Sequence, residues 1–150
     1  MTISRSLVQS GLALTALTLG GLVYVLDRPA GSAQFIPQVI QFDSTAALQF
    51  GWIGANLPSF LHVYAFILLT MSVLRPTYRT LSVVCGGWLG IELLFEVGPQ
   101  LAPSALLETL DPLTRFAPAG VFDPMDVTAL ILGTLAAYLT VISMTRRTKQ

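Results

Sequence analysis

The sequence predicts an all-α integral membrane protein, a bundle of four transmembrane helices with the N-terminus and the C-terminus on the cytoplasmic side. Three observations lead to this fold class. Hydrophobic residues make up 53% of the 150 residues and charged residues only 11%, against roughly 25% charged residues in a typical soluble domain. The apolar residues gather into four long runs, and the basic residues lie mostly on one side of the arrangement that these runs define.

Four apolar windows are long enough to cross the roughly 30 Å of hydrocarbon in a bilayer. They cover about residues 7–26, 57–74, 81–97 and 125–144. The first window carries no charge and spans 20 residues, which is longer than the apolar stretch of roughly 7–15 residues in a signal peptide. We therefore expect a retained first helix and a single transmembrane domain over residues 1–150.

The basic residues orient this bundle, because cytoplasmic loops carry an excess of Lys and Arg. With four spans, only Arg28 and Arg115 fall on the outer side. Six basic residues fall on the other side: Arg5, Arg75, Arg79, Arg146, Arg147 and Lys149. This asymmetry predicts a multi-pass membrane protein with both termini on the cytoplasmic side.

The connections between the spans differ in length. The turn at 75–80 is short and contains Pro76, so the second and third helices should form an antiparallel hairpin. The two outer connections, 27–56 and 98–124, are long. Each contains a segment that suits the membrane interface: 46–53, which includes Trp52, and 104–108, which is leucine-rich.

Small residues recur at four-residue spacing in the last two spans. Gly86 and Gly90 form one such pair, and Gly133 and Ala137 form the other. This spacing lets helix backbones approach closely. It indicates packing inside the bundle or, as the alternative, a face for a second copy.

Composition excludes several function classes. The net charge is zero, so no overall field favours nucleic acid. Cys85 is the single cysteine, cannot form an internal disulfide and suits apolar packing. One histidine with scattered carboxylates is a weak metal signature. We expect no metal and no cofactor, and the partner implied by composition is the lipid bilayer.

Ionisable residues inside the spans are the candidate site, because charge in hydrocarbon is costly and usually functional. His62 lies near the outer end of the second span, and Glu92 and Glu96 lie four residues apart near the outer end of the third. Asp123 and Asp126 flank the start of the fourth. The topology therefore brings His62, Glu92, Glu96 and Asp126 to the outer third of the membrane, with Asp123 just before the last span.

Each of these residues also has a purely structural interpretation. His62 could bond a neighbouring carbonyl or Ser59, and Glu96 could be a solvated residue at a helix end. Asp123 suits the N-cap of a helix with proline next to it, and Asp126 suits the first turn near the positive end of the helix dipole. Glu92 lies deepest and should pair with His62 or stay protonated.

At these residues the sequence resembles the VanZ-like family of small bacterial membrane proteins, over about residues 56–145. Three segments carry the resemblance: Leu-Pro-Ser-Phe-Leu-His at 57–62, Glu-Leu-Leu-Phe-Glu-Val-Gly-Pro-Gln at 92–100, and Gly-Val-Phe-Asp-Pro-Met-Asp-Val-Thr-Ala at 120–129. Three features depart from the family pattern. The spacing from Glu to Gln in the second segment is one residue longer than usual. Leu130 stands where the family usually has Asn, and the Arg that usually precedes the Phe-Asp pair is represented only by Arg115.

The resemblance implies a role in the cell envelope without an assigned activity, since the founding member is associated with resistance to a glycopeptide antibiotic that binds cell-wall precursors. We expect the polar residues to bind a polar lipid or envelope-precursor group. The alternative is a non-catalytic accessory subunit of a larger membrane complex, with other membrane subunits as partners. An enzyme using His62 and a glutamate for acid–base chemistry is a third hypothesis, but the sequence offers no recognisable nucleophile.

Overall fold

The computed structural model describes residues 3–27, 50–101 and 123–147. These residues form four helices: α1 (Ile3–Asp27), α2 (Gly51–Val73), α3 (Tyr78–Leu101) and α6 (Pro124–Arg147). Each is long and apolar enough to cross a membrane. No strand occurs in the described ranges, and the predicted all-α bundle of four membrane-spanning helices is confirmed.

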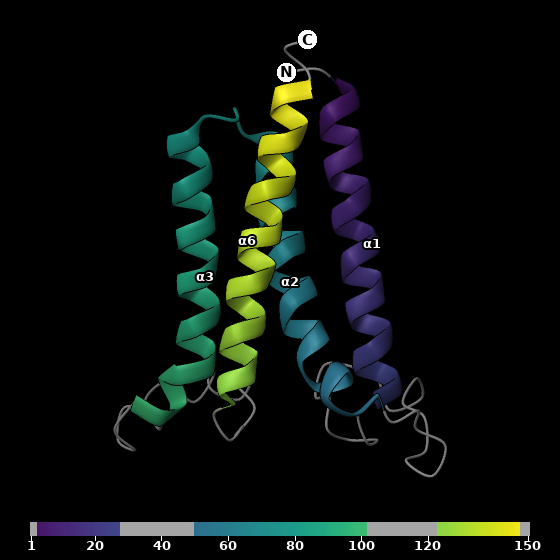
Figure 1. Cartoon of the computed structure of the whole chain (residues 1–150), viewed down its shortest axis with the longest axis vertical. Coiled ribbons are helices and arrows are strands. Elements are labelled where there is room, and N and C mark those ends of the chain that lie inside the picture. Colours follow the sequence, from purple (N-terminus) through teal and green to yellow (C-terminus); the bar gives the residue numbers. More distant parts are fainter. Residues whose placement is uncertain (1–2, 28–49, 102–122, 148–150) are drawn as a thin grey trace.

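Figure 1 shows the four helices side by side, with α2 at the centre, α1 on one flank and α3 on the other. The start of α1, the α2–α3 turn and the end of α6 lie at one end of the bundle. The chain therefore crosses the bundle four times and returns to the end from which it started. We call the end with the termini the inner end and the opposite end the outer end, following the orientation that the basic residues predict.

Helix α2 begins earlier than the sequence predicts. It starts at Gly51 and not near residue 57, so Trp52 and Ile53 belong to its first turn and not to a separate interfacial segment. Gly51 has a φ of 54°, which glycine adopts without steric cost. Pro58 lies inside the helix, where it lacks the N–H for a backbone hydrogen bond and its ring crowds the carbonyl four residues earlier. Residues 46–49, and all of 104–108, lie outside the described residues.

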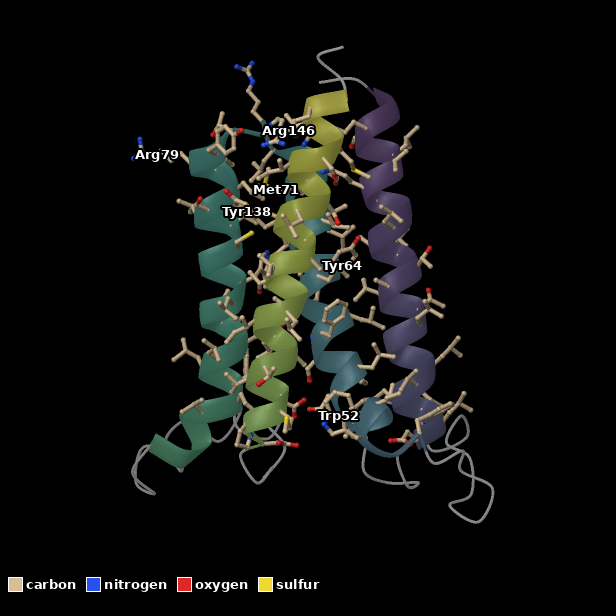
Figure 2. The ribbon with its side chains drawn as sticks, in the orientation of Figure 1. Trp52, Tyr64, Met71, Arg79, Tyr138 and Arg146 are labelled. Atoms are coloured by element: carbon tan, nitrogen blue, oxygen red, sulfur yellow. The ribbon has the colours of Figure 1, made fainter. Side chains whose placement is uncertain are left out.

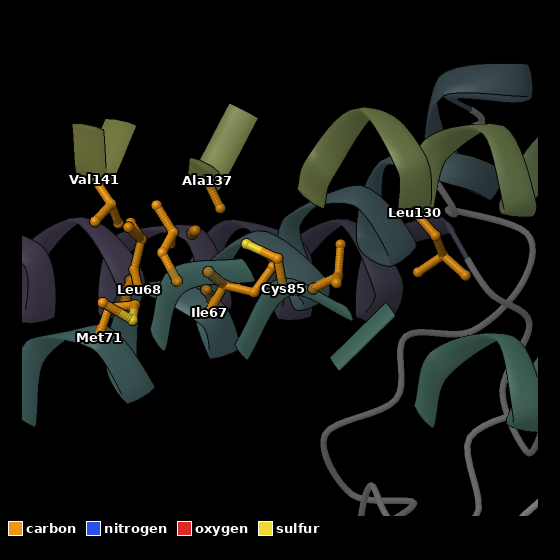
Figure 3. Close-up of a cluster of buried hydrophobic side chains, with 12 residues drawn as sticks. Ile67, Leu68, Met71, Cys85, Leu130, Ala137 and Val141 are labelled. Atoms are coloured by element: carbon orange, nitrogen blue, oxygen red, sulfur yellow. The ribbon is translucent and has the colours of Figure 1, made fainter. Parts of the chain in front are cut away.

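The core of the bundle follows α2, the most buried of the four spans. Its side chains Val63, Ile67, Leu68 and Met71 are fully buried. Figure 3 shows them packed with residues of the neighbouring helices, including Cys85, which is a buried free thiol. Because lipid is as apolar as these side chains, close packing and interhelical hydrogen bonds hold such a core together, and not exclusion of water.

The two pairs of small residues have different surroundings. A Cβ atom at Gly133 would lie 2.5 Å from the Phe60 carbonyl oxygen and 2.7 Å from Val63 Cγ1, so α6 approaches α2 most closely there. Ala137, one turn later, is fully buried. A Cβ atom at Gly86 or Gly90 would meet nothing within 4 Å in the described part of the chain. The spaces beside Gly86 and Gly90 are therefore open as far as the described residues go.

Polar contacts join α2 to α1 at the inner end. Arg5 is only 9% exposed, and its Nη2 donates to Gln9 Oε1 at 3.4 Å and to the Met71 carbonyl at 3.5 Å. Ser6 Oγ donates to the Ser72 carbonyl at 2.8 Å. These bonds use the backbone carbonyls at the end of α2, which lack partners within the helix.

An aromatic contact joins α3 to α2 near the middle of the bundle. The rings of Phe66 and Trp88 stack with centroids 4.6 Å apart. The Trp88 indole N–H donates to Thr70 Oγ1 at 2.9 Å, and the Thr70 hydroxyl in turn donates to the Phe66 carbonyl. A buried indole N–H needs such an acceptor, so this contact fixes the rotation of α3 about its axis.

The close approach at Gly133 gives a stability prediction. Gly133→Ala should lower the free energy of unfolding by about 1–3 kcal/mol, because the added methyl group overpacks the α2–α6 contact. The same change at Gly86, where the space is open, should not lower it. Unfolding of the purified protein in mixed micelles with increasing denaturing detergent measures both. Equal effects of the two substitutions would show that α6 does not pack on α2 through Gly133.

Candidate functional site

Polar side chains from three helices gather at the outer end. They are Ser59 and His62 on α2, Glu92 and Glu96 on α3, and Asp123 and Asp126 at the start of α6. We call these six residues the outer polar cluster. Within each pair the residues are three or four positions apart, so they project from the same side of their helix. The structure joins them across helices in three contacts.

The first contact joins α2 to α3. His62 Nδ1 lies 3.4 Å from Glu92 Oε1, and the two side chains form an ion pair when His62 is protonated and Glu92 is ionised. The side chain of Glu92 is 16% exposed, whereas that of His62 is 48% exposed. The His62 ring also lies 4.3 Å from the ring of Phe66, in a tilted arrangement. Glu92 is thus enclosed, and His62 remains open to a ligand on its other side.

The second contact joins α3 to α6. Glu96 Oε1 accepts a hydrogen bond from the backbone N–H of Asp123 at 3.2 Å. Asp123 Oδ1 accepts in turn from the Met125 N–H at 2.9 Å. Asp123 immediately precedes Pro124, the first residue of α6. Asp123 therefore caps the N-terminus of this helix, as the Asp-Pro pair predicts.

The third contact joins α6 to α2. Ser59 Oγ donates to Asp126 Oδ1 at 2.8 Å. The sequence suggested Ser59 as an alternative partner of His62, but the hydroxyl bonds the aspartate of α6. Asp126 also lies in the first helical turn, where the dipole favours a negative charge. Two sources of stabilisation therefore hold this carboxylate in place.

The cluster is rich in hydrogen-bond acceptors and poor in donors. It holds four carboxyl groups and one histidine, and the Ser59 hydroxyl is already used as a donor. Such a set attracts ligands that bring their own N–H or O–H groups, ammonium groups above all. Among residues 3–27, 50–101 and 123–147, no three His, Cys, Asp or Glu side chains are arranged to hold a metal ion.

Asp27 is a further carboxylate at the outer end, outside the outer polar cluster, and its role is structural. Its Oδ1 accepts from the Phe50 N–H at 2.7 Å, and its carboxyl group occupies the space where a side chain at Gly54 would lie. It therefore caps the start of α2 from the end of α1. Asp27 was not singled out from the sequence. The signal for its role was Gly54, whose lack of a side chain gives the carboxyl group room.

Asn56 is a further buried polar residue that the sequence reading did not single out. Its side chain is 6% exposed, and Nδ2 donates to the Trp52 carbonyl at 2.9 Å. Its Oδ1 has no partner among the described residues. The sequence signal for the burial of Asn56 was an amide side chain in an otherwise apolar helix, because such groups usually face protein and not lipid.

Comparison with known proteins identifies no relative of this chain. No protein-family model matches the chain, and neither the curated proteins nor the solved structures give a significant match.

The Ser59–Asp126 bond gives a prediction that a double-mutant cycle can test. Ser59→Ala and Asp126→Ala should each destabilise the bundle, with a coupling energy of about 0.5–2 kcal/mol between them. Thr128→Ala serves as the control, because the Thr128 hydroxyl donates to a carbonyl of its own helix. The coupling is read from unfolding titrations in mixed micelles. Strictly additive effects of the two substitutions would argue against the bond.

Proposed function

We propose that this chain is a VanZ-like protein of the bacterial cytoplasmic membrane whose outer polar cluster binds a polar group of a lipid or of an envelope precursor. The observation that carries this proposal is the meeting of three helices at one end through His62–Glu92, Glu96–Asp123 and Ser59–Asp126. Polar residues in membrane helices are costly, and such a concentration at one depth favours a ligand site.

The chemistry of the cluster narrows the ligand class. Carboxylates outnumber the histidine four to one, so a phosphate placed directly against them would be repelled. A primary ammonium group would instead donate up to three hydrogen bonds to these oxygens. Phosphatidylethanolamine carries such a group, as do amino-bearing envelope precursors. Half-exposed His62 and the carboxyl group of Glu96 are the side chains placed to meet it.

A binding comparison tests this proposal. Phosphatidylethanolamine should bind the detergent-solubilised protein more tightly than phosphatidylcholine, whose methylated nitrogen has no N–H to donate. Replacing Glu92 and Glu96 together by Gln should weaken phosphatidylethanolamine binding about tenfold or more, because it removes two charged acceptors. Native mass spectrometry with each lipid added in turn measures the bound fraction.

Asp27→Asn is the matched control for this experiment. It also removes a carboxylate at the outer end, but from the contact between α1 and α2. It should leave lipid binding unchanged even if it lowers stability. The proposal fails if both lipids bind equally, or if Asp27→Asn weakens binding as strongly as the double substitution.

A second function is favoured by one different observation, the open glycine face of α3. Gly86 and Gly90 have no neighbour within 4 Å of an added Cβ in the described chain, and α3 is the least buried span. Glycines at this spacing admit a neighbouring helix at short range. In this alternative the chain is an accessory subunit of a larger membrane complex, and the outer polar cluster serves to hold α2, α3 and α6 together.

The mass of the gently solubilised native particle separates the two functions. The accessory-subunit function predicts a particle with other subunits that dissociates when Gly86 and Gly90 are both replaced by Leu. Gly21→Leu is the control, since Gly21 on α1 is equally open. A particle with the mass of one chain or of a homodimer contradicts the accessory role and leaves the lipid-binding proposal in place.

A further inference from the structure

The inner end of the bundle contains a groove between the start of α3 and the end of α6. Its volume is about 270 Å³. Eight residues line it: Pro76, Thr77, Tyr78, Leu81, Val141, Ile142, Thr145 and Arg146. The groove lies at the opposite end of the bundle from the outer polar cluster, and the function proposed above makes no use of it (Figure 2).

The lining of this groove is divided into an apolar part and a polar part. Leu81 and Val141 are buried and form its deeper wall together with Ile142. Thr145 and Arg146 lie one turn further toward the end of α6, next to Thr77 and Tyr78 at the start of α3. The groove thus has an apolar wall and, where the helices end, a polar and basic rim. This arrangement matches the division of a phospholipid into acyl chains and headgroup.

The charge around the groove is positive. Arg146 lines it, and the exposed Arg75 and Arg79 lie at the same end. Among the described residues every Asp and Glu lies at the outer end, so no described carboxylate neutralises these arginines. Thr77 caps the start of α3 by accepting from the Thr80 N–H at 3.0 Å. The remaining first-turn N–H groups of this helix add to the positive potential on the same side.

We propose that this groove binds an anionic phospholipid, with the headgroup phosphate at Arg146 and an acyl chain along Leu81 and Ile142. Arg offers a planar set of donors that suits phosphate oxygens. The predicted orientation places the groove in the cytoplasmic leaflet, where anionic lipids attract basic residues near the helix ends. The proposal is independent of the outer polar cluster.

The test compares two arginines at the same end of the bundle. Figure 2 shows Arg79 on the flank of α3 that faces away from α6, whereas Arg146 lines the groove. Phosphatidylglycerol added to the detergent-solubilised full chain should bind more tightly than phosphatidylcholine. Arg146→Gln should weaken phosphatidylglycerol binding about fivefold or more, and Arg79→Gln should have a clearly smaller effect. Native mass spectrometry of lipid adducts gives both affinities.

A second variant tests the groove without changing its charge. Ile142→Trp fills the apolar wall and should also weaken phosphatidylglycerol binding, while the phosphatidylethanolamine binding proposed for the outer end stays unchanged. Equal loss in Arg146→Gln and Arg79→Gln would overturn the proposal, because it would indicate attraction to charge alone. Full displacement of the lipid by millimolar inorganic phosphate would also overturn it, since the groove would then bind free phosphate and not a lipid.

Discussion

The structure depends on one constraint, the lack of water to satisfy polar groups inside a membrane. Hydroxyl groups along the spans find acceptors within their own helix. Thr15, Thr18 and Thr134 each donate to the carbonyl four residues earlier. Larger polar groups must find partners on neighbouring helices, as Trp88 does on Thr70. Interhelical polar contacts are therefore few, and each restricts the arrangement of the bundle strongly.

The two ends of the bundle carry side chains of opposite charge type. The outer end holds the described carboxyl groups, joined across α2, α3 and α6. The inner end holds the described arginines, with Arg5 bonded to the end of α2 and Arg146 in the groove beside α3. A hydrophobic core along α2 separates the two ends. The proposed ligands follow from this division, ammonium-bearing groups outside and anionic lipids inside.

The sequence predicted the helices better than it predicted their contacts. Four apolar runs of sufficient length can only be spanning helices, and the Asp123–Pro124 pair marks the start of α6 as found. The pairing of Ser59 with Asp126 was not predicted, because it depends on how α2 and α6 are rotated about their axes. The start of α2 was placed too late, since residues 51–56 are less apolar than the run that follows.

The central position of α2 has a consequence for the order in which the chain assembles in the membrane. Among the described helices, α1 and α2 share the most extensive contact and precede α6 in the chain, so they can pair before α6 has been synthesised. Helix α6 then packs on a surface already formed, and Gly133 lets its backbone approach Phe60 and Val63 of α2 closely. Until it arrives, Ser59 and Glu96 lack the partners that α6 supplies. The outer polar cluster is thus completed only once α6 has been synthesised, and a chain truncated before α6 would lack the contacts made by Asp123 and Asp126.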